Sequence, residues 1–254
     1  MIFDSHAHYN DHQFSEDRDA VLASLPQNGI CGVLNCGDTI ESSRFCVDLA
    51  NQYPFICAAV GVHPESVGEM KESNLDALRT MAQNEKVVAI GEIGLDYHYD
   101  DGAAPEVQKY WFKKQIELAR ELDLPFVVHA RDACADTIEV LSEVGYFRGV
   151  MHCFSGSRET AEILLKMGMY IGFGGTVTYK NNKKAKEVAR IVPSNRYLLE
   201  TDCPYLPPDG HRGKRNSSLY LPRVVEELAL LRGCDTETVE KETEENAKRL
   251  FGLL

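Results

Sequence analysis

The sequence predicts an α/β fold, a single (β/α)8 TIM barrel with one additional helix at its carboxyl end. Short β-rich runs alternate with longer amphipathic stretches along the whole chain, and we count eight of each. Strands separated by helices form a parallel sheet, and eight such units are the number that closes a barrel. The length of 254 residues agrees, because barrels of this kind commonly run to about 250 residues.

An open doubly wound sheet is the competing fold. It is disfavoured because no G-x-G-x-x-G motif follows the first predicted strand. No linker, internal repeat or low-complexity tract interrupts the alternation, so we expect residues 1–254 to form one domain.

Each predicted strand is a short run rich in apolar and β-branched residues, bounded in most cases by Gly, Pro, Asn or Asp. The eight runs, in order, are Ile2–Phe3, Gly32–Asn35, Phe55–Val60, Val87–Ile90, Phe126–Val128, Gly149–Met151, Tyr170–Phe173 and Tyr197–Leu199.

Each predicted helix places apolar residues on one face at helical spacing. The eight helices, in order, are Glu16–Leu25, Ser42–Gln52, Leu75–Gln83, Val107–Leu122, Ala135–Val144, Arg158–Met167, Lys183–Ile191 and Leu219–Leu231. Gly145 and Gly168 follow helices and are typical of helix ends. The tail Thr236–Leu254 places Ala247, Leu250 and Phe251 on one face, so we expect a final helix that packs on the barrel.

The composition is that of a soluble globular protein, with 44% hydrophobic and 26% charged residues. No apolar run approaches the roughly 20 residues that span a bilayer, and no signal peptide is evident, so we expect a cytoplasmic protein without membrane contact. The eight cysteines are scattered without a C-x-x-C and indicate buried apolar side chains. A net charge of −12 argues against a broad basic face for nucleic acid, although bound metals can supply positive charge locally.

The stretch Asp4-Ser5-His6-Ala7-His8 follows the first apolar pair. Residues two apart on a strand point to the same face, so His6 and His8 would present two imidazoles side by side. Imidazole is the commonest metal ligand in proteins. A solvated pair at the start of the chain is the alternative, and the rest of the sequence decides between the two.

Chemistry in a (β/α)8 barrel lies at the carboxyl ends of the strands. Five of the eight histidines fall at such ends, together with three carboxylates. These residues are His6, His8, His63, Glu92, His129, His152, Glu200 and Asp202. Any one histidine alone is more simply explained as a buried, hydrogen-bonded side chain. Their coincidence with the carboxylates predicts a metal site.

Two divalent metals that share a carboxylate suit hydrolysis, because they activate water at neutral pH and clamp the reacting group. We expect Glu92 to bridge them, with His6 and His8 on one metal and His129 and His152 on the other. Asp202 is placed to ligate a metal and to orient or deprotonate the water. The donor set accepts Zn, Mn, Co or Ni, whereas Mg favours oxygen-rich sites, so the identity of the two ions stays open.

Six motifs together resemble the TatD family of metal-dependent deoxyribonucleases, an amidohydrolase-type group. They occur in family order over essentially the whole chain: Asp4-Ser5-His6-Ala7-His8, Gly61-Val62-His63-Pro64, Gly91-Glu92-Ile93-Gly94-Leu95-Asp96-Tyr97, Pro125-Phe126-Val127-Val128-His129-Ala130-Arg131, His152-Cys153-Phe154-Ser155-Gly156 and Glu200-Thr201-Asp202-Cys203-Pro204-Tyr205-Leu206.

The resemblance implies a TIM barrel, a two-metal site on the residues above, and hydrolysis of DNA phosphodiesters, commonly as a 3′→5′ exonuclease. It also implies a catalytic or substrate-positioning role for His63 and a site-facing role for Glu200. With Asp202, these two are our candidate catalytic residues. The chain departs from the family at one place. The family often follows Gly-Lys-Arg-Asn with Glu-Pro, whereas Ser217-Ser218 stands here, which leaves the loop after the eighth strand open.

Basic residues near the strand ends are candidates for substrate binding. They are Arg131, the lysines Lys180, Lys183, Lys184 and Lys186, and the cluster Arg212, Lys214 and Arg215. We single out Arg131, Lys214 and Arg215, while solvated helix and loop faces explain the lysines equally well. Tyr97, Phe154, Tyr179 and Tyr205 could stack on bases or pack the barrel rim.

The sequence leaves three functions to distinguish. The first is a two-metal nuclease with DNA, or RNA, as substrate and without an obligate protein partner. The second is a hydrolase of the same metal chemistry that acts on a small ester, lactone, amide or aminoacyl bond, since fold and metals do not determine substrate. The third, a metal-binding protein without catalysis, would have no need of His63 and Glu200.

Overall fold

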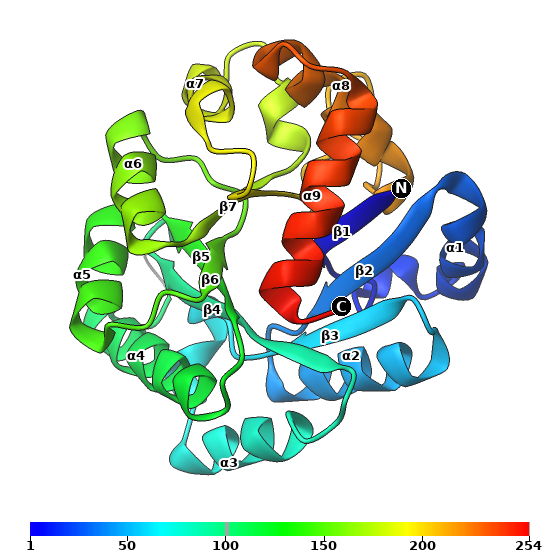
Figure 1. Cartoon of the computed structure of the whole chain (residues 1–254). Helices are drawn as coiled ribbons and strands as arrows, with labels where there is room; N and C mark the ends of the chain where they lie inside the picture. Colours follow the sequence, from blue (N-terminus) through cyan, green and yellow to red (C-terminus); the bar gives the residue numbers. More distant parts are fainter. Residues whose placement is uncertain (100–101, 254) are drawn as a thin grey trace.

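Eight parallel strands, paired in chain order, form the centre of the part of the chain that the structure describes (Figure 1). The structure is a computed structural model, and it describes residues 1–99 and 102–253. The strands are β1 (Ile2–Ala7), β2 (Ile30–Cys36), β3 (Ile56–Val60), β4 (Val87–Asp96), β5 (Phe126–Arg131), β6 (Gly149–Met151), β7 (Tyr170–Phe173) and β8 (Tyr197–Leu199).

The sheet closes between its first and last strands. The Ser5 hydroxyl donates a hydrogen bond to the Leu199 carbonyl at 2.8 Å. Just beyond β8, the Asp202 amide donates to the His6 carbonyl at 2.9 Å, and the His8 amide donates to the Cys203 carbonyl at 2.7 Å. The predicted (β/α)8 barrel is therefore confirmed.

Helices follow the strands and surround the barrel (Figure 1). They are α1 (Arg18–Ser24), α2 (Ile40–Gln52), α3 (Glu72–Met81), α4 (Pro105–Glu121), α5 (Cys134–Val144), α6 (Arg158–Met167), α7 (Lys183–Ile191), α8 (Leu221–Arg232) and α9 (Thr236–Phe251). Short 3-10 turns cover His12–Phe14, Pro26–Asn28, Pro64–Glu69, Gly175–Thr178 and Ser218–Tyr220. None of the described helices is both long and apolar enough to cross a membrane.

Local sequence explains where a helix such as α6 starts and stops. The Ser157 hydroxyl accepts a hydrogen bond from the Thr160 amide and caps the first turn. Gly168 ends α6 with φ of 99°, and Gly145 ends α5 with φ of 67°, in the left-handed region that glycine adopts without steric cost. Both ends agree with the sequence prediction.

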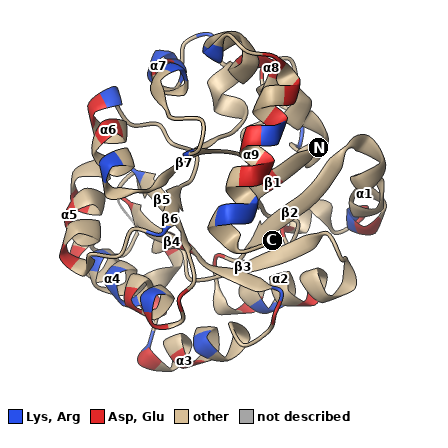
Figure 2. Ribbon diagram, viewed as in Figure 1, with Lys and Arg blue, Asp and Glu red and all other residues tan. Residues whose placement is uncertain are grey.

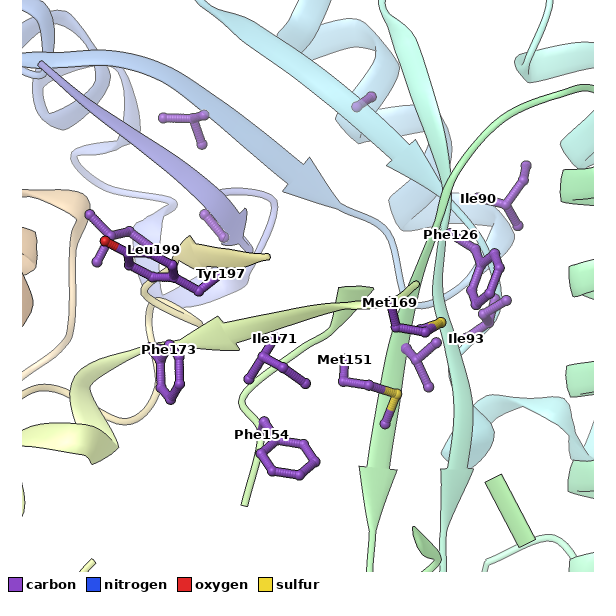
Figure 3. Close-up of a cluster of buried hydrophobic side chains, with 14 of the residues drawn as sticks. Ile90, Ile93, Phe126, Met151, Phe154, Met169, Ile171, Phe173, Tyr197 and Leu199 are labelled. Carbon is purple, nitrogen blue, oxygen red and sulfur yellow. The ribbon is translucent and has the colours of Figure 1, made fainter. Parts of the chain in front are cut away.

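The main core lies between the outer face of the barrel and the helices. Figure 3 shows part of it, where Ile90, Phe126, Met151 and Ile171 of successive strands point away from the barrel axis. Because side chains alternate along a strand, the residues between these positions point inward. Val127, Val150 and Leu198 accordingly belong to a separate inner cluster.

Helix α9 closes the amino-terminal end of the barrel. Its Ala247, Leu250 and Phe251 pack into the inner cluster, and the Phe251 ring lies 6.2 Å from the Phe3 ring. In Figure 1 the red helix lies in front of the strands, near the middle of the ring. With this end filled by apolar side chains, polar groups inside the barrel are confined to the opposite end.

Four strands are longer than predicted: β2 by three residues, and three others well beyond their expected ends. The structure extends β1 to Ala7, β4 to Asp96 and β5 to Arg131, so His6, Glu92 and His129 lie on strands rather than in the loops after them. The prediction ended each strand at its last apolar residue. The backbone pairing continues through polar residues whose side chains point into the barrel, although the apolar run in the sequence has already ended.

Candidate metal centre

The inward face of the barrel changes from apolar to polar along each strand. Val127 and His129 are two residues apart on β5, and Leu198 and Glu200 are two apart at the end of β8. Both members of each pair therefore point to the same side, with the apolar residue lower in the barrel. Gly172 on β7 makes room for this layer, since a Cβ atom there would lie 2.3 Å from a Glu200 carboxylate oxygen.

The Glu92 carboxylate lies at the centre of the polar layer. Its Oε2 is 3.2 Å from the His6 Nε2 and 3.4 Å from the His8 Nε2. The two Nε2 atoms are themselves 2.9 Å apart. The Asp202 Oδ1 lies 3.4 Å from the His8 Nε2 and 3.7 Å from the His6 Nε2. Two imidazoles and two carboxylates thus converge on one point.

The other oxygen of Glu92, Oε1, faces a second set of histidines. It lies 3.0 Å from the His129 Nδ1, and 3.8 Å from the Nε2 atoms of both His63 and His152. Because its two oxygens face different histidine sets, Glu92 has the position that a bridging carboxylate needs.

His152 lies beside both groups of ligand atoms. It was expected to share a metal with His129, and its Nε2 lies 3.8 Å from the Glu92 Oε1 that faces His129. Its ring also stacks against the His6 ring, with centroids 3.6 Å apart, and its Nε2 is 3.7 Å from the Asp202 Oδ1. His63 lies with His129 and Glu92 as well. Inward side chains from opposite strands meet across the barrel axis, and strand order alone does not show which of them meet.

Hydrogen bonds at the second ring nitrogen orient several of these histidines. The His8 Nδ1 lies 2.9 Å from the Cys36 carbonyl and donates to it, which leaves Nε2 as a free ligand atom. The His129 Nε2 lies 2.8 Å from the Asp96 Oδ2, so Nδ1 faces the centre. The His152 Nδ1 makes no hydrogen bond to any residue that the structure describes, although it lies 3.3 Å from a Glu200 oxygen.

His63 is arranged in the opposite way. Its Nδ1 accepts a hydrogen bond from the Glu65 amide at 3.3 Å. The neutral ring therefore carries its hydrogen on Nε2, the atom that faces the centre. Burial lowers the pKa of His63 to about 4 and keeps it neutral. Although it lies within reach of Glu92 and His129, its local bonding suits a hydrogen-bond donor better than a metal ligand.

The charges of the centre fit divalent cations. Burial alone would lower the pKa of His129, but Asp96 and Glu92 outweigh it and raise that pKa to about 10. For His152, burial is likewise outweighed by Glu200, Asp202 and Glu92, and the pKa rises to about 9. The carboxylates therefore hold an excess of negative charge that protons or metal ions must balance.

Three sets of residues have ligand atoms within 4.8 Å of one another, as a metal ion requires. The sets are His6, His8 and Glu92; His6, His152 and Asp202; and His63, Glu92 and His129. Nitrogen and carboxylate oxygen donors of this kind suit zinc and related divalent ions.

Asp4 holds the strand ends that carry the site. Its buried carboxylate accepts hydrogen bonds from the Thr201 hydroxyl at 2.7 Å, the Thr201 amide at 3.0 Å and the Ser218 hydroxyl at 2.6 Å. Ser218 also lies 2.8 Å from the Tyr9 hydroxyl. The departure from the family motif at Ser217-Ser218 thus places Ser218 in a buried network that joins β1 to the loop after β8.

The centre lies in a cavity of about 1140 Å³. Of the three predicted substrate residues, Arg131 lines this cavity, while Lys214 and Arg215 do not. The Arg215 guanidinium donates to both carboxylate oxygens of Asp17, at 2.8 and 2.6 Å, and lies over the Phe14 ring. A substrate contact by Lys214 and Arg215 stays a prediction.

Sequence reasoning did not single out Asp96, although it stands in one of the quoted motifs. It is four residues beyond Glu92 on the same strand, and this spacing places both on one face. Arg212, which the sequence analysis named in the basic cluster with Lys214 and Arg215, lines the cavity. Its guanidinium carbon lies 4.7 Å from the centroid of the Tyr179 ring.

Fold and site together define a TIM-barrel metal-dependent hydrolase. The family model described as TatD related DNase matches residues 3–252. The chain is 42% identical to an uncharacterized metal-dependent hydrolase, YabD of Bacillus subtilis, over all of both chains. It is 36% identical to the 3'-5' ssDNA/RNA exonuclease TatD of Erwinia tasmaniensis, covering 99% of this chain and 100% of that protein.

Among solved structures, that of YJJV, a TatD homolog from Escherichia coli, is similar with a TM-score of 0.92 and 32% identity. The similarity covers 99% of this chain and 98% of that one. The chain belongs to the TatD family, and it is a metal-dependent hydrolase.

Proposed function

We propose that this enzyme removes nucleotides from the 3′ end of single-stranded DNA by hydrolysis at two divalent metal ions. The observation that carries the proposal is the Glu92 carboxylate, which faces two histidine sets at the base of an open cavity. A relative named as a 3'-5' ssDNA/RNA exonuclease supports the substrate class.

In this proposal, His6 and His8 would hold one metal ion, His129 would hold the other, and Glu92 would contact both. Asp202 lies beside the first group, and His152 lies between Asp202 and Glu92. When bound, the ions neutralise the phosphate and lower the pKa of water. Glu200 holds His152 in place through the contact at Nδ1.

Two side chains act on the substrate directly. The Asp202 Oδ1 accepts the proton of the attacking water, because this carboxylate faces the centre and retains 15% exposure to the cavity. His63 donates the hydrogen on Nε2 to a phosphate oxygen or to the leaving oxygen. Both positions fit transition-state charge stabilisation by groups that are already oriented.

The experiment follows oligonucleotides labelled at the 3′ or 5′ end with metal-stripped protein that is re-metallated in turn with Mg, Mn and Zn. We expect metal-dependent stepwise loss from the 3′ end. His129→Ala should abolish it, whereas His98→Ala should not, because the His98 ring is half exposed and contacts Asp132 outside the cavity.

A fully metallated wild-type enzyme that leaves every oligonucleotide intact would overturn the nuclease proposal. Carboxylic esters, lactones, amides and aminoacyl-tRNA, tested in parallel, would then identify the class of small substrate. RNA oligomers of the same sequence determine whether the sugar matters.

A further inference from the structure

Charge is divided across the mouth of the catalytic cavity. Apart from Glu92 and Asp202, the acidic residues that line it are Asp11, Asp38, Glu65, Asp96 and Asp209. The first four follow or end strands β1 to β4. The basic residues that line it are Arg131, Lys180 and Arg212, which end or follow β5, β7 and β8. The β1–β4 side of the rim is therefore acidic, whereas the β5–β8 side carries all three lining cations together with Asp209.

The cations after β7 continue outward from the cavity. Lys180, Lys183 and Lys184 are exposed, and none of the ion pairs within residues 1–99 and 102–253 involves them. Lys186, by contrast, is neutralised by Glu227 at 2.6 Å. Figure 2 shows basic residues along α7. In a chain of net charge −12, three unneutralised lysines in five residues form a local site for anions.

Two further features suit a nucleic-acid strand. The Arg212 guanidinium lies over the Tyr179 ring, and the Tyr179 hydroxyl donates to the Pro207 carbonyl at 2.7 Å, which fixes the ring. Both residues line the cavity together with Lys180. Such a stacked pair offers a flat surface to a base. The first turn of α7 holds Lys183 and Lys184 without an acidic residue, so the helix dipole adds to their positive charge.

We propose that the strand leaves the metal centre over the β7–α7 side of the rim. A base stacks on the Tyr179–Arg212 pair, and Lys180, Lys183 and Lys184 contact the phosphates on the 5′ side of the cleaved bond. The acidic β1–β4 side of the rim repels the strand and leaves this one route. The inference rests on the proposed nuclease function, and it adds a subsite of several nucleotides beside the reacting one.

The test compares Lys180→Glu/Lys184→Glu with Lys166→Glu/Lys241→Glu. The control changes the net charge equally, but Lys166 lies in the last turn of α6 and Lys241 lies on α9, and neither lines the cavity. We measure kcat/KM on dT2 and dT8 as a function of salt. The first variant should lose at least tenfold on dT8 and far less on dT2.

The slope of log(kcat/KM) on dT8 against log[salt] should also become shallower by about 1.4. Each phosphate contact contributes about 0.7 to this slope for single strands, and the variant removes two contacts. The control variant should match the wild type in both respects. Equal losses on dT2 and dT8, or none on either, would overturn the proposed route.

Binding gives a second readout that does not need cleavage. Anisotropy titrations of fluorescein-labelled dT8, and of the RNA octamer, should show weaker binding for Lys180→Glu/Lys184→Glu only. If the wild type cleaves neither dT8 nor the RNA octamer, the nuclease function is contradicted. Unchanged dT8 binding in the first variant would contradict the route by itself.

Discussion

At the scale of single residues, the hydrogen bond at one ring nitrogen of a histidine determines whether the other nitrogen can bind a metal or donate a hydrogen bond. Cys36 holds the His8 Nδ1 and leaves Nε2 to ligate, whereas the Glu65 amide occupies the His63 Nδ1 and makes Nε2 a donor. Asp96 likewise holds the His129 Nε2 and leaves Nδ1 as the atom that faces the centre. Such partners orient a ligand and raise its basicity, so they matter although they do not touch the metal.

Asp96→Asn should weaken metal binding about 10- to 100-fold, because His129 would lose its charged partner. Isothermal titration with Zn or Mn checks this, and excess metal should restore activity. Asp132→Asn is the matched control, since that carboxylate is 66% exposed and pairs with His98. An Asp96→Asn protein that binds metal like the wild type would contradict the role.

Ser218 is the second residue whose role the structure defines. It is fully buried, donates to Asp4 and accepts from Tyr9. Ser218→Ala should lower the free energy of unfolding by about 1–3 kcal/mol, because Asp4 and Tyr9 would each lose one buried hydrogen bond. Urea denaturation measures the loss.

The neighbouring Ser217 supplies the comparison. Its hydroxyl is 3.4 Å from the Leu219 amide and 3.5 Å from the Tyr9 hydroxyl, both long contacts. Ser217→Ala should therefore change stability by less than about 0.5 kcal/mol. Equal effects of the two substitutions would show that the network around Asp4 does not depend on Ser218.

At the scale of elements, α9 and the loops divide the barrel into two ends. The helix fills the amino-terminal end with Leu250 and Phe251, while the carboxyl ends of the strands open into the cavity. Stability and chemistry are therefore supported by different parts of each strand. Substitutions in α9 should act on folding and leave the site geometry intact.

Phe251→Ala should cost about 3–5 kcal/mol of stability, because it opens a cavity beneath Phe3 in the inner cluster. Thermal and chemical denaturation measure this cost. Leu230→Ala on α8 is the control, since that side chain is 77% exposed and should be nearly neutral. If the two variants unfold alike, α9 does not contribute to the barrel core.

At the scale of the whole molecule, the candidate metal centre joins the first and last strands of the barrel. Its residues come from β1, β4, β5 and the ends of β6 and β8, so this set of side chains comes together only in the closed barrel. A ligand that binds only the folded state stabilises it, by about 2.7 kcal/mol at a concentration 100 times Kd.

Chelation should therefore lower the melting temperature, and added Zn or Mn should restore it. Glu92→Gln should respond much less to metal, because the carboxylate that faces both histidine sets would be lost. Differential scanning calorimetry with and without chelator measures both. A wild-type melting temperature that does not depend on metal would contradict the coupling of binding to folding.

The sequence by itself determined the barrel, its chain order and the identity of the residues at the centre. Hydrophobic periodicity is sufficient for this because it is a property of each short segment. Repeats of two and 3.6 residues indicate which side chains share a face of a strand or a helix. Polar residues directly after apolar runs then located the carboxyl ends of the strands. His6, Glu92, His129 and Asp202 were placed together on this ground alone.

Only the tertiary structure determined which of these residues contact one another. It paired His152 with His6, Asp96 with His129 and Arg215 with Asp17, and it placed α9 across the amino-terminal end. These contacts depend on strand register, barrel closure and loop path. Each joins residues distant in the chain, and a local repeat carries no information about distances across the barrel.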